Sequence, residues 1–130
     1  MNKIKNHILF GLRIIIIIVL IQTLRFKFTA HPDSVYIFTA VGLEPYGRIG
    51  IGSIELIISL LLIFPKTIWL GSGLAVGVMG GAIIMHLTEL GIVVNGDSGT
   101  LFYTALVTFA VSFLLLWVYR KDIPIIGHKL

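Results

Sequence analysis

This chain lacks cysteine and contains few charged residues. Without cysteine, it cannot by itself carry out thiol–disulfide exchange, supply a thiolate nucleophile, or ligate an iron–sulfur cluster. Charged residues make up 12% of its 130 residues, about half the share that is usual in a soluble domain, whereas 57% are hydrophobic. The composition therefore excludes a soluble globular fold and intrinsic disorder, and it predicts a membrane protein.

The few charged residues separate four long apolar segments. Each is close to the roughly 20 apolar residues that a helix needs to cross a bilayer. In lipid the backbone must satisfy its own hydrogen bonds, so even the isoleucine-rich first segment is predicted to be helical. We therefore expect one domain, residues 1–130, with an all-α fold and an antiparallel bundle of four transmembrane helices. The predicted spans are residues 8–24, 49–64, 68–90 and 101–119.

Positive charge is distributed unevenly between the predicted loops. With four spans, both chain ends and the second connection lie on one side, which carries Lys3, Lys5, Lys66, Arg120, Lys121 and Lys129. By the positive-inside rule this side is cytoplasmic. We expect a multi-pass protein of a bacterial-type inner membrane with both termini in the cytoplasm. The net charge of +4 then reflects loop charge, and we expect no nucleic acid partner.

The first connection is much longer than the other two, with about 23 residues from Arg25 to Gly47. It contains His31-Pro32-Asp33-Ser34, a pattern typical of the start of a helix. We expect a short amphipathic helix lying on the outer face of the membrane. Long loops in compact domains are often functional, so this loop marks the outer side as the place to look for a site.

Ionisable residues inside the predicted helices concentrate in the outer half of the bundle. Glu55 lies in the second span, seven residues after Arg48 and on the same helix face. His86 and Glu89 share a face near the outer end of the third span, and Arg25 lies just outside the first. A charge near the bilayer centre costs about 2.5–3.5 kcal/mol, so it usually has a partner or a function.

Three interpretations of this cluster are open. It is a structural network in which Glu55 pairs with Arg48 or His86, or it is a pocket for a polar head group. The pocket would use Arg25, Arg48, Glu55, His86 and Glu89 for ligand binding, with an apolar tail between the helices. A metal site built on His86, Glu89 and Glu55 has weak support, because one histidine and two carboxylates lie in a basic neighbourhood, and we expect none.

Small residues recur every four positions in the third and fourth spans. Such residues form flat helix faces, which let helices approach closely. We interpret them as packing faces; the alternative is that the glycines leave room for a flat ligand or a lipid tail. The residues are Gly73, Gly77 and Gly81 in the third span, and Thr100, Thr104, Thr108 and Ser112 in the fourth.

Several short motifs carry a resemblance to a known family. They are Leu24-Arg25-Phe26-Lys27-Phe28, Gly42 to Arg48, Gly52-Ser53-Ile54-Glu55-Leu56, Gly81-Ala82-Ile83 with His86-Leu87, and Gly96-Asp97-Ser98-Gly99. Through them the chain resembles the DoxX family of small four-span membrane proteins, over roughly residues 13–124. The family takes its name from a membrane component associated with thiosulfate:quinone oxidoreductase. Other members are linked to redox-stress systems with soluble sulfurtransferase or superoxide dismutase partners.

Two hypotheses of function follow. The first is a quinone- or lipid-binding membrane subunit of an oxidoreductase or redox-stress complex, in which Glu55 or His86 exchanges the proton that quinone reduction requires. Electrons would come from a membrane or soluble redox partner, because the chain has no self-contained catalytic motif. The alternative is a non-enzymatic membrane scaffold or assembly factor, whose glycine and threonine faces dock onto another membrane protein or a second copy in a homo-oligomer.

Overall fold

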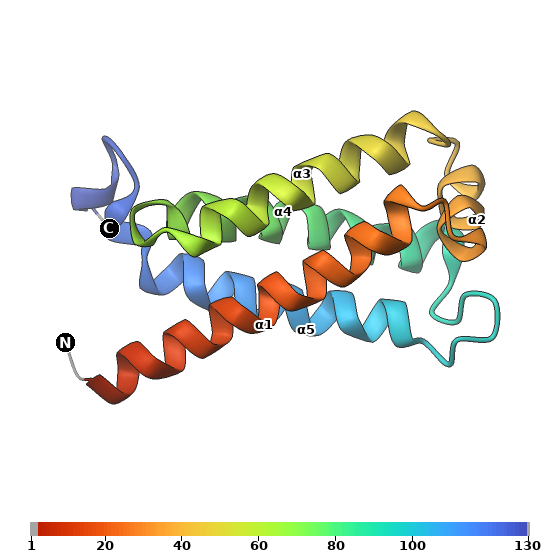
Figure 1. The fold of residues 1–130 in the computed structure, drawn as a ribbon. Coiled ribbons are helices and arrows are strands. Elements are labelled where there is room, and N and C mark those ends of the chain that lie inside the picture. Colours follow the sequence, from red (N-terminus) through yellow and green to blue (C-terminus); the bar gives the residue numbers. More distant parts are fainter. Residues whose placement is uncertain (1–2, 130) are drawn as a thin grey trace.

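The computed structural model describes residues 3–129, and the regular elements within that range are all helical (Figure 1). Four of its helical stretches are long and apolar enough to cross a membrane. The all-α part of the predicted fold is therefore confirmed. The elements are α1 (Lys3–Phe28), α2 (Pro32–Ala40), α3 (Tyr46–Ile63), α4 (Ile68–Met85) and α5 (Thr100–Val118). Short 3-10 turns cover Pro65–Thr67, Arg120–Asp122 and Gly127–Lys129, and a π-helical turn, His86–Leu90, continues α4.

The four long helices lie side by side, and the short α2 lies across one end (Figure 1). α4 and α5 share the most extensive contact, α1 packs on α3, and α3 packs on α4. The fourth neighbouring pair of long helices, α1 and α5, has the smallest contact of the four. We call the end that holds both chain termini the terminal end, and the opposite end, with α2 and the loop 91–99, the α2 end.

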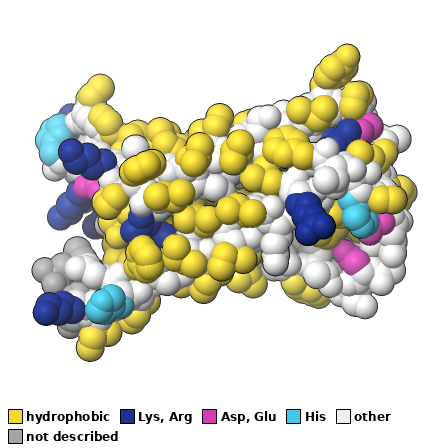
Figure 2. All heavy atoms as spheres, viewed as in Figure 1, with side chains coloured by type: hydrophobic (Ala, Val, Ile, Leu, Met, Phe, Trp, Pro, Cys, Tyr) yellow, Lys and Arg dark blue, Asp and Glu magenta, His cyan; other side chains and the backbone are white. Residues whose placement is uncertain are grey.

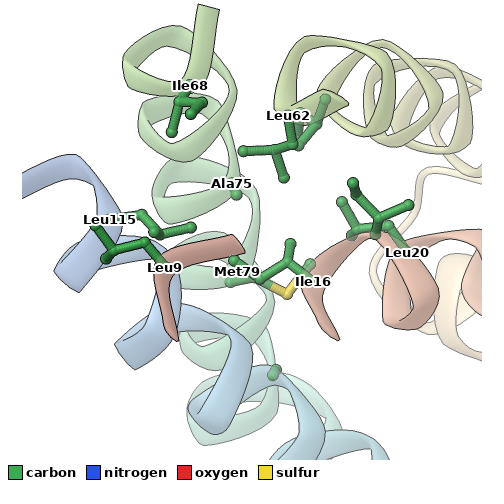
Figure 3. Close-up of a cluster of buried hydrophobic side chains, with 11 residues drawn as sticks. Leu9, Ile16, Leu20, Leu62, Ile68, Ala75, Met79 and Leu115 are labelled. Atoms are coloured by element: carbon green, nitrogen blue, oxygen red, sulfur yellow. The ribbon is translucent and has the colours of Figure 1, made fainter. Parts of the chain in front are cut away.

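The half of the molecule toward the terminal end is filled with apolar side chains. Figure 3 shows this cluster, to which α1, α3, α4 and α5 all contribute. The outer surface between the two ends is also apolar, whereas charged side chains gather mainly toward the ends (Figure 2). Helices that are hydrophobic on every face are typical of a chain surrounded by lipid. The labelled core residues are Leu9, Ile16, Leu20, Leu62, Ile68, Ala75, Met79 and Leu115.

A buried arginine closes the end of α3 in this half. Arg13 donates from Nε to the Leu62 carbonyl at 2.8 Å and from Nη2 to the Ile63 carbonyl at 2.7 Å. The Thr67 hydroxyl donates to the Leu61 carbonyl at 2.6 Å. The last carbonyls of a helix have no partner within it and carry partial negative charge, so a buried cation suits this position.

The α2 end is closed by short segments held by polar side chains. His31 Nδ1 accepts a hydrogen bond from the Asp33 amide at 3.1 Å and caps α2, in the connection where a short helix is predicted. Asn95 Nδ2 donates to Asp33 Oδ1 at 2.9 Å and joins the loop 91–99 to α2. The first long helix ends at Phe28, four residues beyond its predicted boundary. This extension carries Lys27 on a helical turn next to α3.

Candidate functional site

A cavity of about 380 Å³ lies between the helices in the α2 half. All five α-helices contribute to its wall, and most of the lining is aliphatic or aromatic. Its size falls within the range of about 300–1,000 Å³ that is usual for small-molecule sites. The polar side chains in the wall are few, namely Thr23 and Lys27 from α1, Glu55 from α3, His86 from the end of α4 and Thr104 from α5.

Glu55 is the most deeply buried charged group in this wall, with 1% of its surface exposed. Its Oε1 lies 2.9 Å from Lys27 Nζ, and its Oε2 accepts a hydrogen bond from the Thr23 hydroxyl. Thr23 and Lys27 are four residues apart, so they share one face of α1 and reach the same carboxylate. The pairing compensates the desolvation that an isolated buried charge would suffer.

Arg48 lies beside the cavity rather than in its wall. Its Nε lies 2.9 Å from Glu44 Oε1, and its Nη1 donates to the backbone carbonyl of Lys27. The guanidinium is buried, with 7% of the residue exposed. Arg48 therefore ties the end of α1 to the start of α3 and positions the backbone that carries the Lys27 ammonium.

His86 forms another part of the wall, at the point where α4 changes into the π-helical turn. Its Nδ1 lies 2.9 Å from the Gly91 carbonyl, and its ring meets Phe102 edge-on with centroids 5.5 Å apart. A carbonyl only accepts hydrogen bonds, so Nδ1 carries a hydrogen and Nε2 is the nitrogen left for a ligand. Gly91 has φ +78°, a backbone conformation that glycine adopts without strain, and this allows the chain to turn back toward the imidazole.

The predicted glycine face of α4 divides into two parts. A methyl group added at Gly77 or Gly81 meets nothing within 4 Å, and both residues line the cavity. At Gly80 the same methyl group would lie 3.4 Å from Phe109, and at Gly73 it would lie 3.8 Å from Leu116. Of these four glycines, Gly73 and Gly80 contact a neighbouring helix. At Gly77 and Gly81 the packing interpretation is wrong, because the missing side chains leave space in the cavity.

The structure brings two of the five predicted site residues into one wall. Glu55 and His86 line the cavity, Arg48 lies behind it, and Arg25 and Glu89 are exposed and do not line it. Neither expected partner of Glu55 pairs with it, because Lys27 takes that place. The spacing of four residues between Thr23 and Lys27 indicates a shared helix face only if the first helix continues beyond residue 24. The predicted span ends at residue 24 and so leaves Lys27 outside the helix.

The site does not have the geometry of a metal centre. Within residues 3–129, no group of three histidine, aspartate or glutamate side chains is placed to hold a metal ion. Glu89 points to the surface, away from the wall that Glu55 and His86 share. The cavity instead offers an ammonium, a carboxylate and an imidazole to a ligand that is otherwise apolar.

Asp97 lies outside the long helices, in the loop before α5. Burial alone would raise the pKa of its carboxyl, but hydrogen bonds from the backbone amides of Val94, Gly99 and Leu101 lower it, as does the nearby His86. The net effect holds the Asp97 pKa below its ordinary value. The ionised carboxylate thus fixes the loop and the first turn of α5 next to the cavity.

Comparisons of the chain with protein-family models, with curated proteins and with solved structures found no match. The cavity itself is therefore the feature that indicates a function. Its wall combines three groups that can donate or accept a proton with a surface suited to a hydrophobic molecule.

Proposed function

We propose that this chain is a DoxX-like integral membrane protein whose cavity binds a quinone, as a membrane subunit of an oxidoreductase or redox-stress complex. One observation carries the proposal: the buried Lys27–Glu55 pair and His86 face the same largely apolar cavity. Ionisable groups inside an apolar bundle are costly to maintain, which favours a function for them.

The distribution of charge supports a defined orientation in a bacterial-type inner membrane. Seven of the ten Lys and Arg residues, but one of the six acidic residues, belong to the half at the terminal end. The α2 half holds three basic and five acidic residues. By the positive-inside rule, both termini lie in the cytoplasm and α2 lies on the outer face. The cavity then opens in the outer half of the bilayer.

The chemistry of the wall suits a quinone. A quinone has carbonyl oxygens on opposite sides of its ring, and these accept hydrogen bonds. Lys27 on α1 is a strong donor to such an oxygen, and a protonated His86 Nε2 on α4 is a second donor from another helix. Reduction of a quinone takes up protons as well as electrons, and Glu55 and His86 can exchange those protons. A redox partner, membrane-bound or soluble, supplies the electrons.

The scaffold alternative has less support from the geometry. It requires glycine and threonine faces that are free to dock onto another membrane protein. Gly77 and Gly81 instead border the cavity, and Thr108 is buried with 3% of its surface exposed. Thr108 and Ser112 are therefore closed to a partner, whereas Gly77, Gly81 and Thr100 are exposed.

The decisive experiment measures quinone binding by the purified protein in lipid nanodiscs, by extraction of bound quinone and by titration with decylubiquinone. We expect Glu55→Gln to weaken binding by at least about tenfold, since the carboxylate positions the Lys27 ammonium and one charge-assisted contact of that ammonium with the quinone supplies that much. Glu89→Gln removes an exposed carboxylate at the same end of the molecule and should bind quinone like the wild type. Wild-type protein that contains no quinone and binds none on titration would refute the proposal.

A second pair of variants separates ligand binding from folding. Gly81→Leu places an aliphatic side chain in the cavity, whereas Gly50→Leu adds the same side chain at an equally open position on the surface. We expect Gly81→Leu to fold normally and lose quinone binding, and Gly50→Leu to retain it. Equal binding by the two variants would show that the ligand does not occupy this cavity.

A further inference from the structure

A second hollow, of about 320 Å³, lies between α1 and α5. Its wall is aliphatic apart from two threonines and a tyrosine, and it contains no charged residue among those that line it. The two helices that form it have the least contact of the neighbouring pairs. We call this hollow the α1–α5 groove. It is lined by Ile15, Ile16, Val19, Tyr103, Thr104, Val107, Thr108 and Val111.

The α1–α5 groove adjoins the main cavity. Val19 and Thr104 line both hollows, one from each helix. From there the groove follows α5 toward the terminal end, and Tyr103 to Val111 span about 12 Å along the helix axis. Val107 lies in its wall with 59% of its surface exposed, so the groove is open to the surroundings of the bundle.

Building on the proposed quinone site, we propose that the α1–α5 groove holds the hydrocarbon tail of the ligand whose polar head lies at Lys27, Glu55 and His86. The ligand is then a membrane lipid with a tail, and it enters sideways from the bilayer between α1 and α5. The polar groups lie in the main cavity and the uncharged groove adjoins it at Val19 and Thr104. This matches a molecule with a carbonyl head and a long apolar chain.

The position of α2 favours the same route. Ile37, Phe38 and Val41 line the main cavity from the α2 end, where water would otherwise reach it. A soluble compound would have to displace this apolar cover. A lipid that approaches between α1 and α5 meets only side chains with which its tail can pack.

The test compares two probes and two variants. The probes are decylubiquinone and the same quinone head without the decyl chain, titrated against protein in nanodiscs of one lipid composition. Val107→Trp fills the groove without touching the main cavity, and Leu106→Trp places the same side chain at the neighbouring exposed position, outside both hollows. For each probe, the ratio of the dissociation constants of the two variants cancels the partitioning of that probe into lipid.

We expect the wild type and Leu106→Trp to bind the decyl compound at least about tenfold more tightly than the tailless head, since two buried methylene groups supply that difference. Val107→Trp should lose this preference and bind the tailless head as the wild type does. Equal binding of both probes by the wild type, or a preference that persists in Val107→Trp, would refute the assignment of the α1–α5 groove to the tail. Neither result would contradict the proposed quinone site. Wild-type protein that binds neither probe would refute both.

Discussion

The apolar core reaches from the terminal end to the middle of the bundle, whereas the main cavity lies in the α2 half. Both halves are built from the same four long helices. They differ in the residues that face inward. Leu62, Ile68 and Leu115 fill the first half and are essentially inaccessible, while Gly77 and Gly81 leave the second half open. Hydrophobic composition therefore sets the fold class, and side-chain volume at a few inward positions decides where a ligand fits.

The buried charges of the two halves also have different kinds of partner. The guanidinium of Arg13 in the terminal half donates hydrogen bonds to the carbonyl groups at the end of α3 and does not line the main cavity. Lys27 and Glu55 in the α2 half neutralise each other and remain in contact with open space. A cation bound to the last carbonyl groups of a helix stabilises the fold. An ion pair on a cavity wall can in addition contact a ligand.

The largest effect is expected from breaking the ion pair on one side only. Lys27→Met leaves the Glu55 carboxylate buried without a cation, and we expect the free energy of unfolding to fall by about 3–5 kcal/mol. Unfolding by sodium dodecyl sulfate in mixed micelles measures this. The double variant Lys27→Met/Glu55→Gln should recover most of the loss, because no buried charge remains. If the single variant is as stable as the wild type, the pair is hydrated rather than buried.

Removal of the cation in the terminal half should have the next largest effect. Arg13→Met leaves two carbonyl groups of α3 without a partner, and we expect a loss of about 2–3 kcal/mol in the same assay. Quinone binding should stay unchanged, because Arg13 does not border the cavity. The control Arg25→Met, at an exposed arginine, should change stability by less than about 0.5 kcal/mol. A combined loss of binding and stability in Arg13→Met would contradict the separation of the two halves.

Replacing a single glycine of α4 by alanine should change stability in opposite directions in the two halves. A methyl group added at Gly71 would lie 3.1 Å from side-chain atoms of Leu61 and Leu62, so Gly71→Ala should destabilise the protein by about 1 kcal/mol. The same change at Gly77 meets open space and should stabilise α4 by about 0.5–1 kcal/mol, because alanine favours helices. Thermal unfolding followed by tryptophan fluorescence compares them. Destabilisation by both would mean that the cavity closes around Gly77.

The smallest effect concerns the loop at the α2 end. The pKa of Asp97 is lowered in the folded protein, so the unfolded chain binds the extra proton and stability falls as the pH falls below about 4. We expect the hydrogen-exchange protection factors in the first turn of α5, which correct for the intrinsic pH dependence of exchange, to fall as the pH drops below about 4 in the wild type. Asp97→Asn should show faster exchange throughout and no such pH dependence. A pH dependence that persists in Asp97→Asn would assign it to another group.

The sequence predicts the four long helices well, because an apolar run of sufficient length leaves the chain few alternatives in lipid. It also places Glu55 and His86 at similar depth, since depth depends only on the distance along each helix from its end. The short helix in the first connection is indicated by Pro32 and the capping residue before it. These features depend on local sequence, and the structure contains all of them.

The features that the sequence leaves open depend on how the helices are rotated about their axes. Lys27 becomes the partner of Glu55 only because α1 continues to Phe28 and turns that face toward α3. Glycines at a spacing of four have the same pattern whether they touch a neighbour or border a space. At Gly77 the outcome is decided by the side chains that the neighbouring helices present, which lie far away in the sequence.

The uneven packing of the helices also affects how the molecule can be assembled and opened. α4 and α5 follow each other along the chain and share the largest contact, so they form the most extensively packed helical hairpin of the bundle. α1 reaches α3 only after the chain has crossed the long first connection. The interface of α1 with α5 joins the earliest helix to the last one and is the smallest of the four. It is therefore the interface whose separation, while the other three stay intact, gives up the least contact.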